Sequence, residues 1–355
     1  MLRRHLRTSA LIAAASALAL VAAACGSDTS EDASSDSPTV VVTTSILGDV
    51  VANVVGDEAT VEVLMPAGVD PHEFELSAAE AAQLQDADVI VANGLGFEAG
   101  MTDALDAAEE AGVPVIEVAP GLDPLPLAEG AHDHAHEEEG AHDEEAAHSE
   151  EEAAHSEEEA AHDEEAAHSE EEGEALDPHV FTDPARMADG VEQLATSLGE
   201  EVPALAGDVV AEQAATYADE VRAADQAIEE ELSAIPADQR VLVTNHEVFA
   251  YFADRYDFEV IGTVIPGGTT LAETSSQELT DLAAVIEENE VPAIFADASS
   301  PTELADALAE EGGLDVEVVA LYSESLGEPG SDAETYLDMI TSNSAAITAA
   351  LSGTS

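Results

Sequence analysis

The sequence predicts an α/β protein of two lobes, each built on a parallel, doubly wound sheet, joined by a long rigid helix. A length of 355 residues suits two domains of roughly 100–200 residues each. From residue 39 onward, apolar segments rich in β-branched residues alternate with helical segments, stop at a helical block without strands, and then resume. Strands that alternate with single helices are typical of a parallel sheet covered by helices on both faces.

The N-terminal lobe is assigned to residues 39–200. It contains a low-complexity insert at 129–174 that is too polar to bury a core, so we predict that the insert is disordered. A helix at 185–198 follows the insert. The other elements expected in this lobe are strands at 40–44, 59–65, 87–93 and 113–119, and helices at 46–55, 77–85 and 102–112.

A linking segment at 201–236 contains a predicted helix at 203–232, and the C-terminal lobe occupies 237–355. At a rise of 1.5 Å per residue this helix would reach about 45 Å, enough to brace both lobes. The elements expected in the C-terminal lobe are strands at 240–245, 258–264, 291–297 and 316–322, and helices at 248–256, 276–289, 301–311 and 333–351.

Residues 1–24 have the pattern of an export signal, with arginines at 3, 4 and 7 before an apolar run at 11–24. The signal ends at Cys25, the only cysteine in the chain, which excludes an intramolecular disulfide. The small residues before Cys25-Gly26 resemble a bacterial lipobox, which predicts acylation of Cys25 and anchoring to the membrane. Ordinary cleavage and twin-arginine export are the alternatives. Residues 25–38 are polar and acidic and are predicted to be a flexible tether.

The charge of the chain is strongly negative, −72, with 79 acidic residues against 7 arginines and lysines together. Such a chain repels nucleic acid and anionic membrane surfaces and attracts cations. We therefore expect no nucleic-acid partner.

The histidines divide into two groups. Of 12 histidines, one lies in the export signal and eight lie in the insert, so the folded body has only His72, His179 and His246. Each stands in a loop or at the start of a helix, and two share the context Asp-Pro-His. Because ligands of open parallel sheets bind at the carboxyl ends of strands, we expect the three imidazoles to converge in the cleft between the lobes.

Three imidazoles with a carboxylate or a water form a natural zinc site. Glu324, directly after the last strand, is the best fourth ligand, and Glu247 and Asp297, also at strand ends, are weaker candidates. A zinc hydrolase would use the same ligand types, but the His246-Glu247 pair has Ala250 where an H-E-x-x-H motif needs its second histidine. We therefore expect a binding protein, not an enzyme.

Four segments resemble the solute-binding lipoproteins of zinc and manganese ABC importers, known as cluster A-I or family 9. They are MPAGVDPHEFE at 65–75, ALDPHVFTDP at 175–184, TNHEVFAYFADRYDFEVIG at 244–262 and ALYSESLGEPGSDAETYLDMI at 320–340. The resemblance covers residues 38–352 apart from the insert. It implies a monomeric, extracytoplasmic protein, anchored to the bacterial membrane, that passes a divalent metal ion to a permease with an ATPase partner.

The resemblance also assigns the metal ligands. It places them at His72, His179 and His246, with the fourth ligand at the position of Glu324, where relatives usually carry Asp. At the position of Asp297 relatives commonly carry Glu. A histidine at position 246, where manganese-type members have Glu, makes the site nitrogen-rich and favours Zn²⁺ over Mn²⁺ or Fe²⁺.

Residues 141–172 of the insert form a near-perfect repeat of histidines separated by acidic residues. This resembles the His-rich loop of zinc-type members, which predicts an auxiliary metal site; the alternative is a solvated charge run. A metal-dependent surface adhesin or sequestration protein would share the main site, and the sequence leaves that function open. The candidate auxiliary ligands are His132, His134, His136, His142, His148, His155, His162 and His168.

Overall fold

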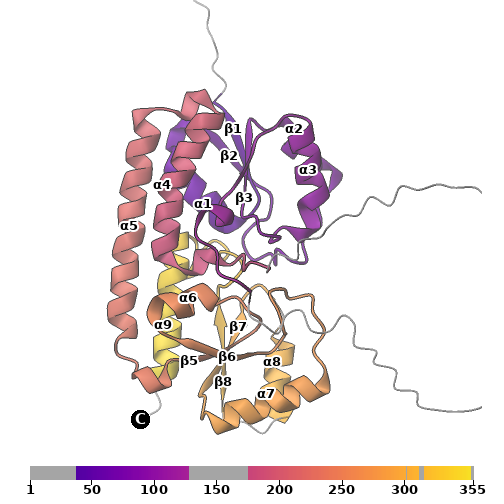
Figure 1. The fold of residues 1–355 in the computed structure, drawn as a ribbon, viewed down its shortest axis with the longest axis vertical. Helices are drawn as coiled ribbons and strands as arrows, with labels where there is room; N and C mark the ends of the chain where they lie inside the picture. The colour runs from indigo at the N-terminus through magenta and orange to yellow at the C-terminus, as the bar shows by residue number, and fades with distance from the viewer. Residues whose placement is uncertain (1–36, 128–174, 301, 312–315, 353–355) are drawn as a thin grey trace, which may run out of the picture. The chain divides into compact units, whose positions relative to one another are not determined.

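The computed structural model describes residues 37–127, 175–300, 302–311 and 316–352, all within one compact unit that spans Ser37–Ser355. The export signal, Cys25 and the eight insert histidines lie outside the described residues. Within the described ranges, no helix is long and apolar enough to cross a membrane. Two α/β lobes are visible in Figure 1, in agreement with the predicted fold class.

The N-terminal lobe has a four-stranded parallel sheet in the order β2-β1-β3-β4. The chain enters at the centre of the sheet and moves outward to both edges, which is the doubly wound topology that the sequence predicted. The elements are β1 Thr39–Val42, α1 Ser45–Val55, β2 Thr60–Val63, α2 Ala78–Asp86, β3 Val89–Ala92, α3 Thr102–Glu110 and β4 Val115–Glu117.

The C-terminal lobe repeats this arrangement with a parallel sheet in the order β6-β5-β7-β8. Because all four strands are parallel, the residues that follow β5 and β8 lie on the same side of this sheet. The elements are β5 Val241–Thr244, α6 Ala250–Tyr256, β6 Glu259–Thr263, α7 Ser276–Glu288, β7 Ala293–Asp297, α8 Glu303–Glu311, β8 Glu317–Leu321 and α9 Tyr336–Ser352.

The central strands are apolar on both faces because each face packs on a different core. In β1, Val40 and Val42 belong to the cluster that contains α1, whereas Val41 belongs to a second cluster with Leu84 and Ala108 of α2 and α3. A strand buried on both sides has no polar face, so its sequence is a continuous apolar run. This explains the VVV and VIV segments.

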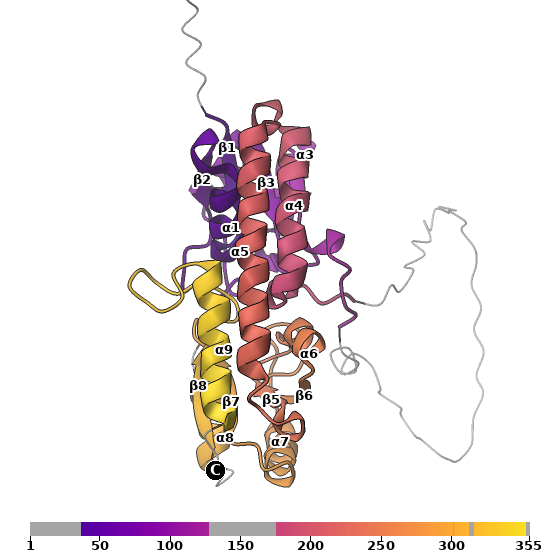
Figure 2. The same cartoon turned by 90° about the vertical axis from the view of Figure 1, so that its left-hand side faces the viewer.

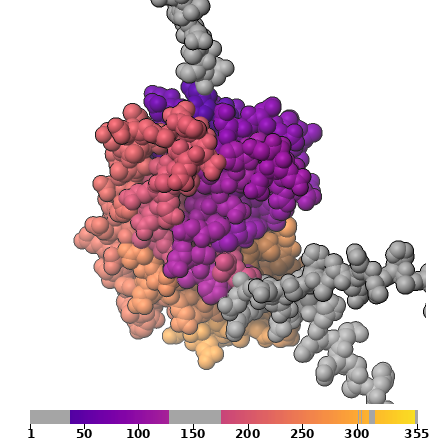
Figure 3. All heavy atoms as spheres, turned by 45° about the horizontal axis from the view of Figure 1, so that its top comes forward, coloured from indigo at the N-terminus to yellow at the C-terminus, as the bar shows by residue number. Residues whose placement is uncertain are grey.

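The largest core cluster is continuous through both lobes and the helices beside them. It joins residues of α1 in the first lobe with residues of α4 Pro184–Glu201, α5 Asp208–Leu232 and α9. Over the face shown in Figure 3, the atoms of the two lobes meet directly. The lobes therefore share a hydrophobic core, which opposes wide separation.

Helix α5 is the brace between the lobes, packing against α1 of the first lobe and α9 of the second, with α4 beside it (Figure 2). It begins at Asp208, later than the predicted 203, because Pro203–Leu205 forms a separate 3₁₀ turn and Gly207 is in an extended conformation at the N-cap. The helix is 25 residues long, so at 1.5 Å per residue it spans about 37 Å.

Polar contacts from two buried residues in the middle of α5 join the helix to both lobes. On the side of the first lobe, the Tyr217 hydroxyl donates to Asp49 Oδ2 at 3.1 Å. On the side of the second lobe, Asp225 accepts from Arg255 Nε at 2.9 Å and Nη2 at 2.6 Å, and from the Tyr256 hydroxyl at 2.9 Å. These contacts hold the brace to α1 and to α6.

Replacing Asp225 with alanine is expected to destabilise the protein by about 2–4 kcal/mol, because it removes one partner of a mostly buried ion pair. The matched control is Glu229→Ala, since Glu229 also faces Arg255, but at 3.6 Å and with its side chain 64% exposed. An exposed pair contributes less than about 1 kcal/mol. Urea unfolding followed by circular dichroism measures both changes, and equal losses in the two variants would contradict the role of Asp225 as an anchor.

Candidate metal centre

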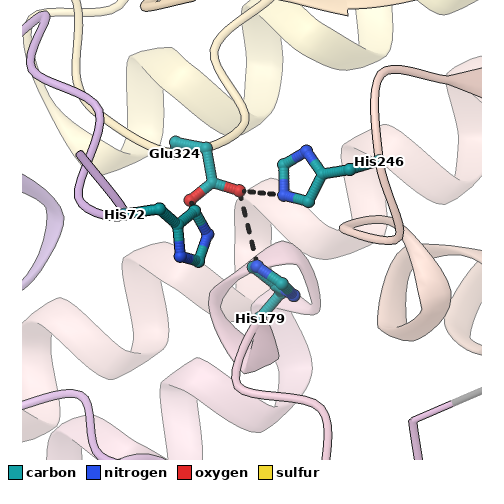
Figure 4. A group of neighbouring side chains, drawn as sticks. All are labelled: His72, His179, His246 and Glu324. Carbon is teal, nitrogen blue, oxygen red and sulfur yellow. Dashed lines mark ion pairs between the residues drawn. The ribbon is translucent and has the colours of Figure 1, made fainter. Parts of the chain in front are cut away.

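Four loops bring His72, His179, His246 and Glu324 together at the interface of the lobes (Figure 4). His72 lies in the loop between β2 and α2, and His179 directly precedes the 3₁₀ turn Val180–Thr182. His246 follows the end of β5 by two residues, and Glu324 follows the end of β8 by three. The structure thus places the three histidines side by side with Glu324, the carboxylate expected to be the fourth ligand. The sequence analysis expected this convergence because ligands of parallel sheets bind at the carboxyl ends of the strands.

The four side chains approach each other at distances typical of metal ligands. Nε2 of His246 lies 2.7 Å from Oε1 of Glu324, and Nε2 of His179 lies 3.4 Å from the same oxygen. Nε2 of His72 lies 3.5 Å from Oε2 of Glu324. Tetrahedral zinc with bonds of about 2.0–2.1 Å separates its ligand atoms by about 3.3–3.4 Å. The observed distances scatter around that value.

The ligand atoms are buried but make no hydrogen bonds. His179 and His246 are fully buried, Glu324 is 1% exposed and His72 is 7% exposed. The three Nε2 atoms and both Glu324 oxygens have no hydrogen-bond partner among the described residues, in spite of their short separations. Buried polar atoms without partners are rare in folded proteins. One divalent cation would satisfy all of these atoms, so the donor set fits a metal ion.

Charge interactions shift the pKa values of two ligands in opposite directions. Burial opposes ionisation of Glu324, but the charges of His179 and His246 outweigh it and hold the pKa of this carboxyl well below its usual range. Burial also opposes the charge on His179, yet Glu324 and Asp177 raise the pKa of its imidazole to about 10. At neutral pH the metal-free centre therefore carries a proton on His179 that a metal must displace.

Asp177 supports the metal centre in a way that the sequence analysis missed. Its Oδ1 accepts from the backbone N–H of His179 at 2.9 Å and lies 2.7 Å from Nδ1 of the same ring. A carboxylate on the far nitrogen fixes the tautomer and leaves Nε2 free for the metal. The signal was the repeated Asp-Pro-His, in which an aspartate stands two residues before the histidine ligand. Asp70 likewise accepts from the backbone N–H of His72 at 2.9 Å.

The other two carboxylates considered from the sequence are outside the group of converging ligands. Asp297, the last residue of β7, is 1% exposed and accepts hydrogen bonds from Ser299 and Ser323. Burial, followed by the charge of Glu324, raises the pKa of Asp297. Glu247 lines a neighbouring cavity of about 450 Å³ with Phe249 and Val260. Glu324 is thus the one carboxylate of the three that joins the histidines.

Replacing Asp177 with asparagine is expected to lower the zinc affinity about tenfold, within the range seen when partners of metal-ligating histidines are changed. The amide oxygen still accepts a hydrogen bond, but the charge opposite the His179 ring is lost. Asp70→Asn is the control, because Asp70 contacts the His72 backbone and Ser300. Competitive titration with a zinc chelator dye measures both. An equal effect of the two substitutions would argue against a special role of the ring contact.

The fold and the centre define a two-lobed protein with a buried site for a divalent transition metal between its lobes. Residues 40–350 match the sequence profile of ZnuA, the periplasmic zinc-uptake complex component A. The chain therefore belongs to this family of substrate-binding components of metal transporters, as the resemblance of its motifs predicted.

Individual relatives carry the names of different metals. The chain is 27% identical over 329 residues to the manganese-binding lipoprotein MntA of Halalkalibacterium halodurans, which covers 92% of this chain and 93% of that protein. It is 29% identical over 329 residues to the zinc-binding protein TroA of Treponema pallidum, with 91% and 92% covered. The solved structure of the periplasmic zinc-binding protein TroA superposes with a TM-score of 0.69 at 27% identity, covering 88% of this chain and 99% of that one.

Proposed function

We propose that this protein captures Zn²⁺ outside the cytoplasm and delivers it to an ABC-type importer made of a permease and an ATPase. The observation that carries the proposal is the convergence of three imidazole nitrogens and one carboxylate, with ligand atoms all within 4.8 Å of one another, at a buried site between two lobes. In this proposal the lobes are residues 39–200 and 237–355, and 201–236 link them.

The choice of zinc is supported by the chemistry of the donors. Zinc is commonly four-coordinate with nitrogen and carboxylate ligands, whereas Mn²⁺ prefers more oxygen and an octahedral shell. Burial of all four ligands leaves little room for additional waters. Manganese or iron is the alternative cargo, and the similarity to the manganese-binding lipoprotein MntA supports manganese.

Binding alone cannot separate these metals, because most sites with N and O ligands bind Zn²⁺ more tightly than Mn²⁺. The test is uptake by cells that lack the protein and carry either the wild type or the His246→Ala variant, with zinc and manganese measured by elemental analysis. The wild type is expected to restore zinc accumulation and the variant is not. Restoration of manganese accumulation in place of zinc would assign the protein to manganese.

The His-rich insert is proposed as an accessory that raises the local concentration of zinc. The insert histidines lie outside the described residues, but Leu127 and Ala175, which flank the insert, are described. Leu127 N donates to Ala175 O at 2.8 Å, and the Tyr251 hydroxyl contacts Leu125 N and Asp177 O at 3.0 and 2.5 Å. Because Asp177 also holds His179, the insert leaves the fold next to the metal centre.

Attachment to the membrane is proposed through acylation of Cys25. The tether at 25–38 would then keep the lobes within reach of the permease. Mass spectrometry of the mature protein from its native membrane is expected to show an N-terminal lipid on Cys25, and loss of that lipid in the Cys25→Ser variant. A soluble, unmodified protein that begins at or after residue 25 would show ordinary cleavage.

A further inference from the structure

Asp297 is a second buried carboxylate, close enough to Glu324 of the metal centre for their charges to interact. Asp297 ends β7 and is 1% exposed, and its four hydrogen bonds all come from serines. Among the described residues, no arginine donates a hydrogen bond to Asp297. A carboxylate buried without a cationic partner is costly and needs several hydrogen bonds to be tolerated.

The two oxygens of Asp297 have different partners. Oδ1 accepts from Ser299 N at 2.8 Å and from the Ser299 hydroxyl, so it stabilises the turn that follows β7. Oδ2 accepts from the Ser323 hydroxyl at 2.5 Å and from Ser323 N at 3.3 Å. Ser323 is the residue directly before Glu324. One oxygen is therefore committed to the backbone that carries the carboxylate ligand.

The residue after Glu324 is fixed as well, but from the other lobe. The Ser325 hydroxyl is 3.0 Å from the Ser45 hydroxyl and accepts from Gly68 N at 2.9 Å. Glu324 is thus held between two serines with separate supports. Of these supports, the bond from Ser323 to Asp297 lies within the C-terminal lobe. Asp297 can therefore place Glu324 independently of the contact between the lobes.

We propose that Asp297 is a positioning residue for the metal centre: through Ser323 it fixes the backbone of Glu324 and so aims that carboxylate at the three histidines. It does not ligate the ion, because both of its oxygens are occupied by serines and it lies outside the converging group. This inference rests on the proposed function, in which Glu324 is the fourth ligand.

The experiment compares Asp297→Asn with the matched control Ser299→Ala in protein that starts after Cys25. Asparagine offers one carbonyl oxygen in place of two carboxylate oxygens, so the Ser323 contact is weakened. Asp297→Asn is expected to lower the zinc affinity about 10-fold to 100-fold, the range for residues that orient metal ligands. Ser299→Ala alters the partner of the other oxygen and is expected to change the affinity less than about threefold, since Ser299 does not touch the Glu324 segment.

A double-mutant cycle with Glu324→Ala separates positioning from a general effect on the fold. If Asp297 acts through Glu324, Asp297→Asn causes no further loss of zinc affinity once Glu324 is alanine. The visible absorption of bound Co²⁺ gives a second readout, because it reports ligand geometry. It is expected to change in Asp297→Asn and to stay as in the wild type in Ser299→Ala.

Two outcomes would overturn the proposal. One is an Asp297→Asn protein that keeps the wild-type zinc affinity and Co²⁺ spectrum. The other is an equal loss of affinity with and without Glu324, which would show an effect of charge or folding. If Asp297→Asn does not fold, Ser323→Ala takes its place in the cycle with the same expected pattern. Wild-type affinity in Glu324→Ala alone would show instead that the ligand assignment in the proposed function is wrong.

Discussion

Replacing His246 with alanine is expected to lower the zinc affinity of the main site by about two to three orders of magnitude. Four ligands that share about 10–16 kcal/mol of zinc binding contribute about 2.5–4 kcal/mol each, and each 1.4 kcal/mol is about tenfold in affinity. His246 is fully buried and has the shortest distance to Glu324, 2.7 Å. Its loss also removes one of the two histidine charges that offset the burial of the Glu324 carboxylate.

The measurement is competitive titration of two soluble forms that start after Cys25, one with residues 129–174 and one with a short linker in their place. The form without the insert is expected to bind one zinc ion tightly and to lose it on His246→Ala. In the longer form, His168→Ala serves as a control in the insert and is expected to leave the tightest site unchanged. If the shortened protein binds no zinc, the insert is the zinc site and the cleft assignment is wrong.

The zinc affinity is expected to rise about tenfold per pH unit between pH 6 and pH 9, since one proton must leave for each ion bound. The pKa of His179 in the metal-free protein is raised from 6.5 to about 10 by Glu324 and Asp177, against the opposing effect of burial. Below that value the imidazole is protonated and cannot ligate. Acidification therefore weakens binding, and the increase with pH ends near the raised pKa.

Titration calorimetry in buffers of different ionisation enthalpy measures the protons released. About one proton per zinc ion is expected from His179 at pH 7. Asp177→Asn is the informative variant, because removing this charge lowers the pKa of His179, so the rise in affinity with pH is expected to end at a lower pH. An affinity independent of pH from 6 to 9 would contradict the assignment of the bound proton to His179.

The same shifts make the stability of the metal-free protein depend on pH. The raised pKa of His179 contributes stability that is fully present below 6.5 and is lost as the pH rises through about 10. The lowered pKa of Glu324 contributes stability that is present above 4.5 and is lost as the pH falls. Metal-free protein is thus expected to be most stable in the mildly acidic range between these limits. Zinc should remove the alkaline loss, because the ion replaces the proton.

The fold and the four converging residues could be predicted from the sequence because of one physical rule. Parallel strands align their carboxyl ends, so residues a few positions after β5 and β8 must lie at the same edge. His246 and Glu324 follow that rule directly. The alternating series of apolar strands and amphipathic helices likewise leaves few topologies other than the doubly wound one.

The contacts that support the metal centre could not be predicted in the same way. Ser45 and Ser325 meet across 280 positions of the chain, and no local pattern marks either residue. Asp297 was considered as a possible ligand because it ends a strand. In the structure, its two carboxylate oxygens instead accept hydrogen bonds from Ser299 and Ser323. The start of α5 depended on whether Pro203 begins the helix or a separate turn, and a proline suits both. Side-chain contacts of this kind can be identified only from the three-dimensional structure.

The measurement that tests the central claim most directly is a crystal structure of the zinc-loaded protein with anomalous diffraction recorded on both sides of the zinc edge. A single strong zinc peak is expected within about 2.0–2.2 Å of Nε2 of His72, His179 and His246 and of a Glu324 oxygen. Zinc peaks confined to the insert, or a main site that excludes Glu324 or any of the three histidines, would contradict the account.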